Sequence, residues 1–355
     1  MGVKFQAYPH EQGNQITIHV RMLDEENSLQ QEALGVVGVN LLYAAFFLHH
    51  NPRLMLESLL DNLSTERLEI DMIEFSGIEF RCVDNRVVSL KLVQTGLSRA
   101  AMFGPSGEVL QPSEVLRKRP ILVERGRFRP VTKVNIDMMR CAHQQFTSEP
   151  GVNGNQVVQL MEATMRDMLT SGDDIDLQDF LARADLLATT GKIVLISDYF
   201  EYYRLAAYLA KYTSEPIAIA MGTASLQDLF REQFYAELEG GILEAFGKLF
   251  TKNLRLYVYP HLDPVTGLLT TTENVEIPAE LRSLYRHLME RGGIRKLDNF
   301  DRSVPNIFSR EVLTRIKVND PCWQEMVPPE IASMIKRRKF FGYRETEVRE
   351  ELLVS

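Results

Sequence analysis

Short apolar runs alternate with longer segments of helical periodicity from about residue 119 onward. The apolar runs that predict strands lie at 121–124, 157–161, 192–197, 217–221 and 254–259. The segments with helical spacing lie at 135–146, 175–188, 201–211, 226–235, 279–291 and 309–317. The run at 157–161 is equally compatible with the start of the helix that follows it. Because strands that alternate with helices form parallel sheets, we predict a doubly wound α/β fold. Such sheets bind ligands at the carboxyl ends of their strands.

The residues before this alternation predict a smaller mixed α/β domain. Strand-like alternation occurs at 15–23 and 68–75, and helical segments begin near residues 30, 52 and 85. Two short apolar runs flank a Gly-Pro-Ser-Gly turn within 100–110, which predicts a hairpin. A short basic stretch then marks a boundary. The predicted division is an N-terminal domain of unknown type at 1–118, a second domain at 119–343 and a charged C-terminal tail at 344–355.

The most apolar stretch, residues 33–48, predicts a buried helix. It is shorter than the roughly 20 residues that a bilayer requires, and Asn40 interrupts it. The first residues of the chain have no apolar run after their single lysine, so we expect no signal peptide. The three cysteines, Cys82, Cys141 and Cys322, form no CxxC pair, so we expect them to be reduced and buried. These features predict a cytoplasmic protein with no membrane partner.

The charge balance restricts the kinds of ligand. The 355 residues include 40 Lys and Arg against 48 Asp and Glu, a formal net charge of -8. Hydrophobic residues make up 45% of the chain, which is ordinary for a globular protein with a sizeable core. An acidic surface has no general attraction for nucleic acid or for an anionic membrane. We therefore expect no nucleic-acid partner, and any phosphate site must be local.

A local reversal of charge follows the first predicted strand of the second domain. Arg127, Arg129 and Lys133 place three cations within seven residues. The loop leads into a helix N-terminus, where backbone N–H groups and the helix dipole favour phosphate. Gly126 permits a conformation that a Cβ would disfavour, and Pro130 stiffens the loop. The segment predicts an anion site, the alternative being a solvated basic loop.

Residues 126–138, GRFRPVTKVNIDM, resemble the opening signature of the nucleotidyltransferase superfamily, which includes the adenylyltransferases of nicotinate mononucleotide and of phosphopantetheine. That signature, Gly-x-Phe-(Asp/Asn)-Pro-x-(Thr/His)-x-Gly-His, follows the first strand of a Rossmann-like sheet. Residues 307–313, IFSREVL, are similar to the late Ile-Ser-Ser-Thr-x-x-Arg, and residues 221–226, MGTASL, to the Gly-x-Asp-x-Leu turn. Residues 326–343 are similar to the ending of nicotinate mononucleotide adenylyltransferases. The resemblance covers 121–343 and implies a Rossmann-like domain of nucleotidyltransferase type there.

The resemblance implies adenylyl transfer, in which a phosphate attacks the α-phosphorus of ATP. Mg²⁺ then binds the phosphates, and no cofactor is covalently bound and no resident metal site is expected. Thr132 and Asn135 stand at the two catalytic positions. The candidate nucleotide-binding residues are Gly126, Arg127, Phe128, Arg129, Lys133, Gly222, Ser309, Arg310 and Arg315. Aromatic residues within 199–203 follow a strand end where a base would stack, but half-buried packing explains them more simply.

Several positions depart from the family pattern, among them Arg310, which stands in place of Thr. Asn135 replaces the second His and cannot carry the positive charge of an imidazolium, and Val134 replaces the Gly. Ala224 replaces the Asp, and Leu313 replaces the late Arg. Losing one charge-stabilising donor typically lowers a rate by about 10²–10³, so the departures affect catalysis more than the fold. The cations that would compensate are Arg127, Arg129, Arg310 and Arg315. For the last two, the alternative is an exposed helix face.

Three functions are compatible with this sequence. The first is a nucleotide-binding protein of this fold with altered or lost adenylyl transfer, a pseudoenzyme that serves as a sensor or interaction module. The second is an active adenylyltransferase of nicotinate or nicotinamide mononucleotide in NAD biosynthesis, using ATP. The third is a non-catalytic assembly protein that binds no nucleotide. The first two predict ATP or a mononucleotide at 126–135. In each case the N-terminal domain is where we expect a protein partner or a second copy to bind.

Overall fold

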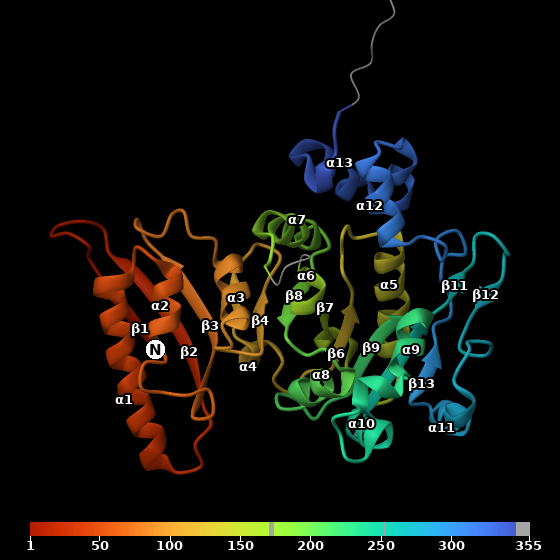
Figure 1. Ribbon diagram of the computed structural model, residues 1–355, viewed down its shortest axis with the longest axis horizontal. Coiled ribbons are helices and arrows are strands. Elements are labelled where there is room, and N and C mark those ends of the chain that lie inside the picture. Colours follow the sequence, from red (N-terminus) through yellow and green to blue (C-terminus); the bar gives the residue numbers. More distant parts are fainter. Residues whose placement is uncertain (170–173, 252, 346–355) are drawn as a thin grey trace, which may run out of the picture.

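The computed structural model describes residues 1–169, 174–251 and 253–345, and a large sheet runs through most of it (Figure 1). Its strands lie in the order β13-β10-β9-β6-β7-β8-β4-β5. Their bounds are β4 (Ala100–Phe103), β5 (Val109–Leu110), β6 (Ile121–Arg125), β7 (Val158–Thr164), β8 (Ile193–Ser197), β9 (Ile217–Gly222), β10 (Leu254–Tyr259) and β13 (Ile294–Lys296). A separate hairpin joins β11 (His261–Leu262) to β12 (Leu269–Thr270).

Six neighbouring strands of the large sheet are parallel, from β13 across to β8. Numbered by their order in the chain, they read 6-5-4-1-2-3, which is the Rossmann order. The first of them, β6, lies between β7 and β9, with Val123 opposite Leu160 on one side and Ile219 on the other. The direction of winding therefore reverses between β6 and β9. Sheets of this kind bind ligands at the carboxyl ends of the strands beside this switch point.

Helices cover both faces of the sheet, as the sequence predicts for a doubly wound fold. One face carries α5 (Lys133–Thr147), α7 (Leu177–Ala188), α12 (Ser309–Lys317) and α13 (Pro329–Arg338). The other carries α8 (Tyr202–Leu209), α9 (Thr223–Leu229), α10 (Gly241–Leu249) and α11 (Arg282–Glu290). Along β6, Leu122 packs into the first core, whereas Ile121 and Val123 pack into the second. Burial on both faces explains why these strands read as unbroken apolar runs.

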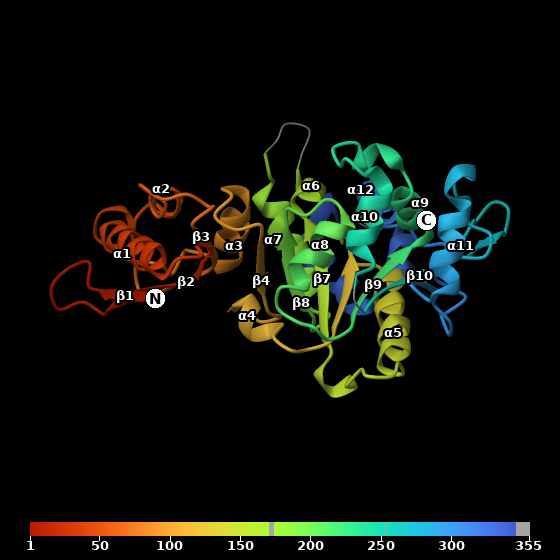
Figure 2. The same ribbon diagram turned by 90° about the horizontal axis from the view of Figure 1, so that it is seen from below.

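The N-terminal residues form a smaller core around a three-stranded antiparallel sheet. Its strands are β1 (Gly2–Phe5), β2 (Asn14–Met22) and β3 (Leu68–Ser76), paired in that order. They pack against α1 (Asn27–Tyr43) with its π-helical continuation (Ala44–Leu48), α2 (Pro52–Ser58) and α3 (Asn85–Gln94). Figures 1 and 2 place this unit at one end of the large sheet, next to β4. The short helix α4 (Pro112–Val115) then leads toward β6.

The structural boundary between the two units lies earlier than the predicted one at residue 118. The predicted hairpin at 100–110 forms, but β4 pairs antiparallel with β8, and β5 pairs with β4. Both are therefore edge strands of the large sheet. The smaller core ends at Leu97, and α3 packs on both cores, with Val88 in one and Leu90 in the other. Local pattern misses this boundary because the partner strand β8 lies much later in the chain.

Other elements of the large unit also differ from the sequence prediction. The strand at 254–259 is not the last, since β13 follows it. Helix α10 forms where no helix was predicted, and the helix predicted at 226–235 is divided between α9 and a 3-10 turn at 232–235. The run at 157–161, ambiguous in sequence, is part of strand β7. The predicted charged tail at 344–355 lies outside the described residues from 346 onward.

The apolar helix of the N-terminal unit differs most from its prediction. With its π-helical end it covers residues 27–48, long and apolar enough by composition to cross a membrane. One face, which includes Ala33 and Val37, is buried in the N-terminal core. The opposite face is exposed, with Val39 66% and Phe47 63% exposed. The predicted buried helix is thus buried on one side only. Because its sequence is apolar all round, periodicity could not distinguish the two faces.

Candidate functional site

The loop after β6 is shaped by its own aromatic side chain. Phe128 is buried in the core beneath α5, with a positive φ of 47°. A Cβ on Gly126 would lie 2.8 Å from the Phe128 ring, so packing requires glycine at this position. From the sequence, glycine is expected at this position because of its backbone conformation. The structure gives a different cause, which is the close approach of the Phe128 ring. Gly126 and Phe128 therefore shape the loop, while Arg127 and Arg129 project from it.

The N-terminus of α5 closes on a polar group of the sheet. Asn135 Oδ1 accepts hydrogen bonds from the backbone N–H and from the hydroxyl of Thr132, at 2.8 and 2.9 Å. Asn135 Nδ2 donates to Oε1 of Glu124 in β6 at 2.7 Å. Glu124 is 0% exposed, and its Oε2 has no hydrogen-bond partner among the described atoms. Burial raises the pKa of Glu124 to about 8, so this side chain is largely a neutral carboxylic acid at pH 7.

Through these contacts both predicted catalytic residues, Thr132 and Asn135, are hydrogen-bonded to other groups of the chain. Thr132 is the N-cap of α5 and is only 2% exposed. Both polar atoms of the Asn135 side chain are hydrogen-bonded inside the chain. Neither residue lines the large cavity beside the loop, and Lys133 does not line it either. The arrangement is a reciprocal helix cap, and the role it shows directly is the positioning of α5.

A cavity of about 1250 Å³ opens at the carboxyl ends of β6, β7 and β9. Its walls come from the β6–α5 loop, from α6 (Met165–Met168) after β7, and from α7, α9 and α12. The arginines that line it are Arg127, Arg129, Arg166, Arg183 and Arg310. The acidic residues that line it are Asp167, Asp176, Asp179 and Glu311. We call it the arginine cavity.

Three of these arginines are paired with carboxylates of the same wall. Arg127 Nε lies 2.9 Å from Asp167 Oδ1, and Arg129 Nε lies 2.6 Å from Asp179 Oδ1. Arg183 Nε donates to the other oxygen of Asp179 at 2.7 Å, and Arg183 Nη1 donates to the backbone carbonyl of Asp167 at 3.0 Å. These charge-assisted contacts hold the three guanidinium groups in place at the wall.

The other two arginines of the cavity make no ion pair within residues 1–169, 174–251 and 253–345. The Arg166 guanidinium lies 4.2 Å from the centre of the Phe200 ring. The side chain of Arg310, on the first turn of α12, has no hydrogen-bond partner in that part of the chain. A guanidinium without a carboxylate partner is available to bind a phosphate or carboxylate through two parallel hydrogen bonds. Within the described part of the chain, Arg166 and Arg310 are thus the free cations of the cavity.

Other positions singled out by the family resemblance also line the arginine cavity. Ser309 begins α12, and its hydroxyl donates to the backbone carbonyl of Pro130 at 3.3 Å, which ties α12 to the β6–α5 loop. Ala224 and Leu313 line the cavity as well. Where the family pattern has Asp and Arg, this cavity therefore has two apolar side chains.

The structure brings together four of the predicted nucleotide-binding residues: Arg127, Arg129, Ser309 and Arg310. Gly222 ends β9 as the N-cap of α9 without lining the cavity. Arg315 lies outside it, with Nη2 2.8 Å from Oε1 of Glu311 and Nη1 2.5 Å from Oδ2 of Asp320. Sequence reasoning missed Arg166 and Arg183. The available signal was position, since Arg166 follows the end of β7 by two residues, at the ligand-binding edge.

A smaller cavity of about 370 Å³ adjoins the arginine cavity. The two share Arg127, Arg166 and Asp167. The aromatic residues in its walls are Phe200, Tyr202, Phe234 and Tyr235. The rings of Phe200 and Phe234 meet edge to face at 5.3 Å, and the Arg125 guanidinium lies 4.4 Å from the centre of the Tyr202 ring. Such walls suit a planar aromatic ring with a negatively charged substituent.

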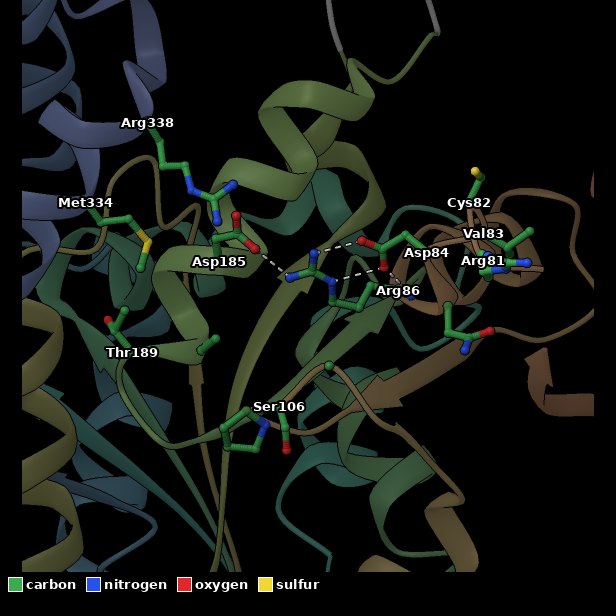
Figure 3. Close-up of a pocket in the computed structure, with 14 residues that line it drawn as sticks. Arg81, Cys82, Val83, Asp84, Arg86, Ser106, Asp185, Thr189, Met334 and Arg338 are labelled. Atoms are coloured by element: carbon green, nitrogen blue, oxygen red, sulfur yellow. Dashed lines mark hydrogen bonds and ion pairs between the residues drawn. The ribbon is translucent and has the colours of Figure 1, made fainter. Parts of the chain in front are cut away.

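Another cavity, of about 730 Å³, lies where the N-terminal unit meets α7 and α13 (Figure 3). Arg86 of α3 bridges two carboxylates there, 2.8 Å from Asp84 and 2.7 Å from Asp185. Arg338 of α13 extends toward Asp185 from the opposite wall (Figure 3). The hydrogen bonds that Arg86 donates to the two carboxylates raise its pKa. The cluster therefore joins the two units and leaves Arg86 no free charge for a ligand.

The cysteines and potential metal ligands add little to the site. All three cysteines are free, but only Cys141 is buried, whereas Cys82 and Cys322 are exposed. The expectation of three buried thiols is thus wrong for two of them. No group of three or more His, Cys, Asp or Glu residues in the described part of the chain is arranged to hold a metal ion.

Comparisons with known proteins find matches by structure but none by sequence. No protein-family model matches the chain, and no curated protein matches its sequence. The fold is similar to that of nicotinic acid mononucleotide adenylyltransferase of Plasmodium falciparum, solved in complexes with APC and with NaAD. The TM-scores are 0.39 and 0.38, the identities 10% and 9%, and each comparison covers 64% of this chain and 98% of the other. The Rossmann-like assignment rests on the strand order of this chain itself.

Proposed function

We propose that this protein binds a nucleotide through its phosphates in the arginine cavity, with an adenylyl-transfer chemistry that is altered or lost. The observation that carries the proposal is the gathering of five arginines around one cavity at the switch point of an acidic chain. Guanidinium groups match the geometry of phosphates. Arg166 and Arg310, which have no carboxylate partner among the described residues, would contact the phosphates directly.

Altered chemistry is supported by the residues at the family's catalytic positions. The Asn135 side chain is hydrogen-bonded to Glu124 and Thr132, and Ala224 and Leu313 are apolar. Phosphoryl and adenylyl transfer depend on charges placed around the reacting phosphates. The arginines therefore support nucleotide binding. The residues at the positions expected to stabilise the transferring group carry no charge with which to do so. A nucleotide sensor or interaction module fits this combination best.

Mg²⁺ would enter this site together with the nucleotide. Asp167 and Asp179 face the loop but are already paired with Arg127 and Arg129. Mg²⁺ is commonly bound by one or two carboxylates together with substrate phosphates. When bound, the ion would neutralise phosphate charge. The work of this chain's own residues is to orient the phosphates, with Arg310 on one wall of the cavity and Arg129 on another.

Calorimetric titration of the full chain with Mg-ATP tests the proposed binding. Arg310→Ala removes a free guanidinium from the cavity, so we expect the Kd to rise about tenfold or more. Arg315→Ala on the same helix is the matched control, because the Arg315 guanidinium does not line the cavity and is already paired with Glu311 and Asp320. Its Kd should change by less than about twofold. Equal weakening by both variants, or no heat from the unmodified chain across a range of temperatures, would contradict the proposal.

An active adenylyltransferase of nicotinate or nicotinamide mononucleotide is the second candidate. It is favoured by the aromatic-walled cavity, which shares Arg127 and Arg166 with the arginine cavity and would hold a pyridine ring beside bound ATP. Release of pyrophosphate from Mg-ATP and nicotinate mononucleotide distinguishes the two candidates. Turnover that Arg129→Ala lowers at least about tenfold would establish the enzyme. Binding of ATP without turnover supports the sensor. Roles in NAD biosynthesis and in the cytoplasm stay predictions.

A further inference from the structure

Helix α1 lies far from α9 and α12, which line the arginine cavity (Figure 2), and its exposed side is an apolar surface. Its large side chains are Leu34, Val39, Leu42, Tyr43, Phe46 and Phe47, which are between 44% and 66% exposed. We call this surface the α1 face. Because each of these six side chains is at least 44% exposed, together they expose on the order of several hundred Å², the size of the largest apolar patch on a typical monomer.

We propose that the α1 face binds the α1 face of a second copy of this chain, with the two helices antiparallel. A standard protein interface takes about 800 Å² from each partner, so the α1 face supplies most of the area that a stable dimer needs. A surface that meets its own copy across a twofold axis forms a closed pair. The pairing is independent of the proposed nucleotide site, which lies on the other unit.

The residue pattern of the α1 face is that of a helix–helix seam. Gly35, Val39, Leu42 and Phe46 follow one another at spacings of four, three and four residues, as in a coiled-coil stripe. No atom lies within 4 Å of a Cβ built on Gly35, so this part of the helix is open to the approach of another backbone. On the opposite side, the buried residues hold α1 in the N-terminal core. The seam therefore faces outward on a helix that is already fixed in position.

Charges at the two ends of α1 favour an antiparallel pair. The side chain of Glu32, near one end, is 62% exposed and pairs with Arg67 at 3.3 Å. That of Arg53, beyond the other end and in α2, is 74% exposed and pairs with Glu57 at 3.0 Å. In an antiparallel pair Glu32 of one copy lies toward Arg53 of the other, whereas a parallel pair brings like charges together. No Lys or Arg occurs between Arg21 and Arg53. Helices that lie on membranes carry such cations on their polar face, so the charge pattern favours protein over lipid.

Sedimentation equilibrium of the full chain over a wide concentration range tests the pairing. We expect a reversible monomer–dimer equilibrium. Leu42→Glu places a charge at the centre of the seam and should raise the dissociation constant at least about thirtyfold. Leu243→Glu, at a residue of α10 that is 65% exposed, is the matched control and should leave the constant unchanged. Both side chains are at least half exposed, so the thermal midpoint of each monomer should match that of the unmodified chain.

A chain that stays monomeric at every concentration overturns the proposal. Flotation with phosphatidylcholine vesicles would then assign the α1 face to a lipid surface, and failure to float would assign it to a different protein.

Disulfide trapping tests the direction of the pair. Cys82→Ser and Cys322→Ser first remove the two exposed thiols. Gly35→Cys and Phe46→Cys are then made in separate chains of that background. In an antiparallel pair position 35 faces position 46, so only a mixture of the two variants should crosslink under mild oxidation. Crosslinking of either variant alone shows a parallel pair and overturns the antiparallel arrangement.

Discussion

The N-termini of α5 and α12 lie side by side at the switch point, but their polar side chains are used differently. The contact between Ser309 and Pro130 joins the two regions. At α5, Thr132 and Asn135 bond to each other, and Asn135 bonds to Glu124. At α12, Arg310 faces the arginine cavity without a partner in the described part of the chain.

This difference shows that a segment can match a family motif without having polar groups available to bind a ligand. The α5 region carries the stronger sequence resemblance, yet its polar groups satisfy one another within the fold. The α12 region departs from the family pattern at Arg310 and Leu313, yet it supplies a free cation to the cavity. A resemblance locates a segment, whereas its hydrogen-bond partners decide whether a ligand can be bound there.

Removing the α5 cap should produce the largest effect on stability. Asn135→Ala deprives buried Glu124 and the N-terminus of α5 of a hydrogen-bond partner. We expect the free energy of unfolding to fall by about 3–4 kcal/mol, measured by urea denaturation. Because Asn135 does not line the arginine cavity, the Kd for Mg-ATP should change by less than about twofold in the folded variant. An affinity loss as large as that of Arg310→Ala, with stability intact, would show that Asn135 contacts the nucleotide.

The acid beneath that cap should make stability depend on pH. The pKa of Glu124 is raised from 4.5 to about 8 by burial, so the folded chain keeps a proton that the unfolded chain releases above about pH 4.5. The stabilising contribution is therefore complete below about pH 4.5 and is lost as the pH rises toward about 8.

Glu124→Gln removes this titration while keeping the shape of the side chain. Relative to the unmodified chain, the variant should gain on the order of 3 kcal/mol of stability between about pH 5 and about pH 8. The unpaired amide of the variant lowers the free energy of unfolding by the same amount at every pH. The quantity to measure is therefore the difference between the two chains in the slope of that free energy against pH. If the free energies of unfolding of the two chains changed with pH by the same amount, a neutral, buried Glu124 would be contradicted.

The sequence predicted much of the fold because most elements have a clear local period. The strands at 121–124, 192–197, 217–221 and 254–259 and the helix at 309–317 all form near the predicted bounds. The large sheet begins before the boundary predicted at 118, because β4 pairs with β8, which no local pattern reveals. The burial of α1 was overestimated for a related reason, since an apolar sequence does not show how many of its sides are covered.

The site was harder to predict because its residues meet only through topology. Arg127, Arg129, Ser309 and Arg310 were selected by local chemistry or resemblance and do share one cavity. Arg166 and Arg183 lie outside every recognised motif and reach that cavity from α6 and α7. One signal was overlooked: a glutamate, at position 124, within a strand that otherwise reads as fully buried. A carboxyl group there requires a partner, and Asn135 is that partner.

The smallest predicted effect compares two acids that share one arginine. Glu311 and Asp320 both pair with Arg315, but only Glu311 lines the arginine cavity. Glu311→Gln removes a negative charge from the cavity and should lower the Kd for Mg-ATP about two- to threefold at low salt, with a smaller gain at high salt. Asp320→Asn is the matched control and should leave the Kd unchanged, because it loosens Arg315 without altering the charge of the cavity. Equal effects of the two variants on calorimetric titration would mean that Arg315, rather than Arg310, is the cation of α12 that meets the phosphates.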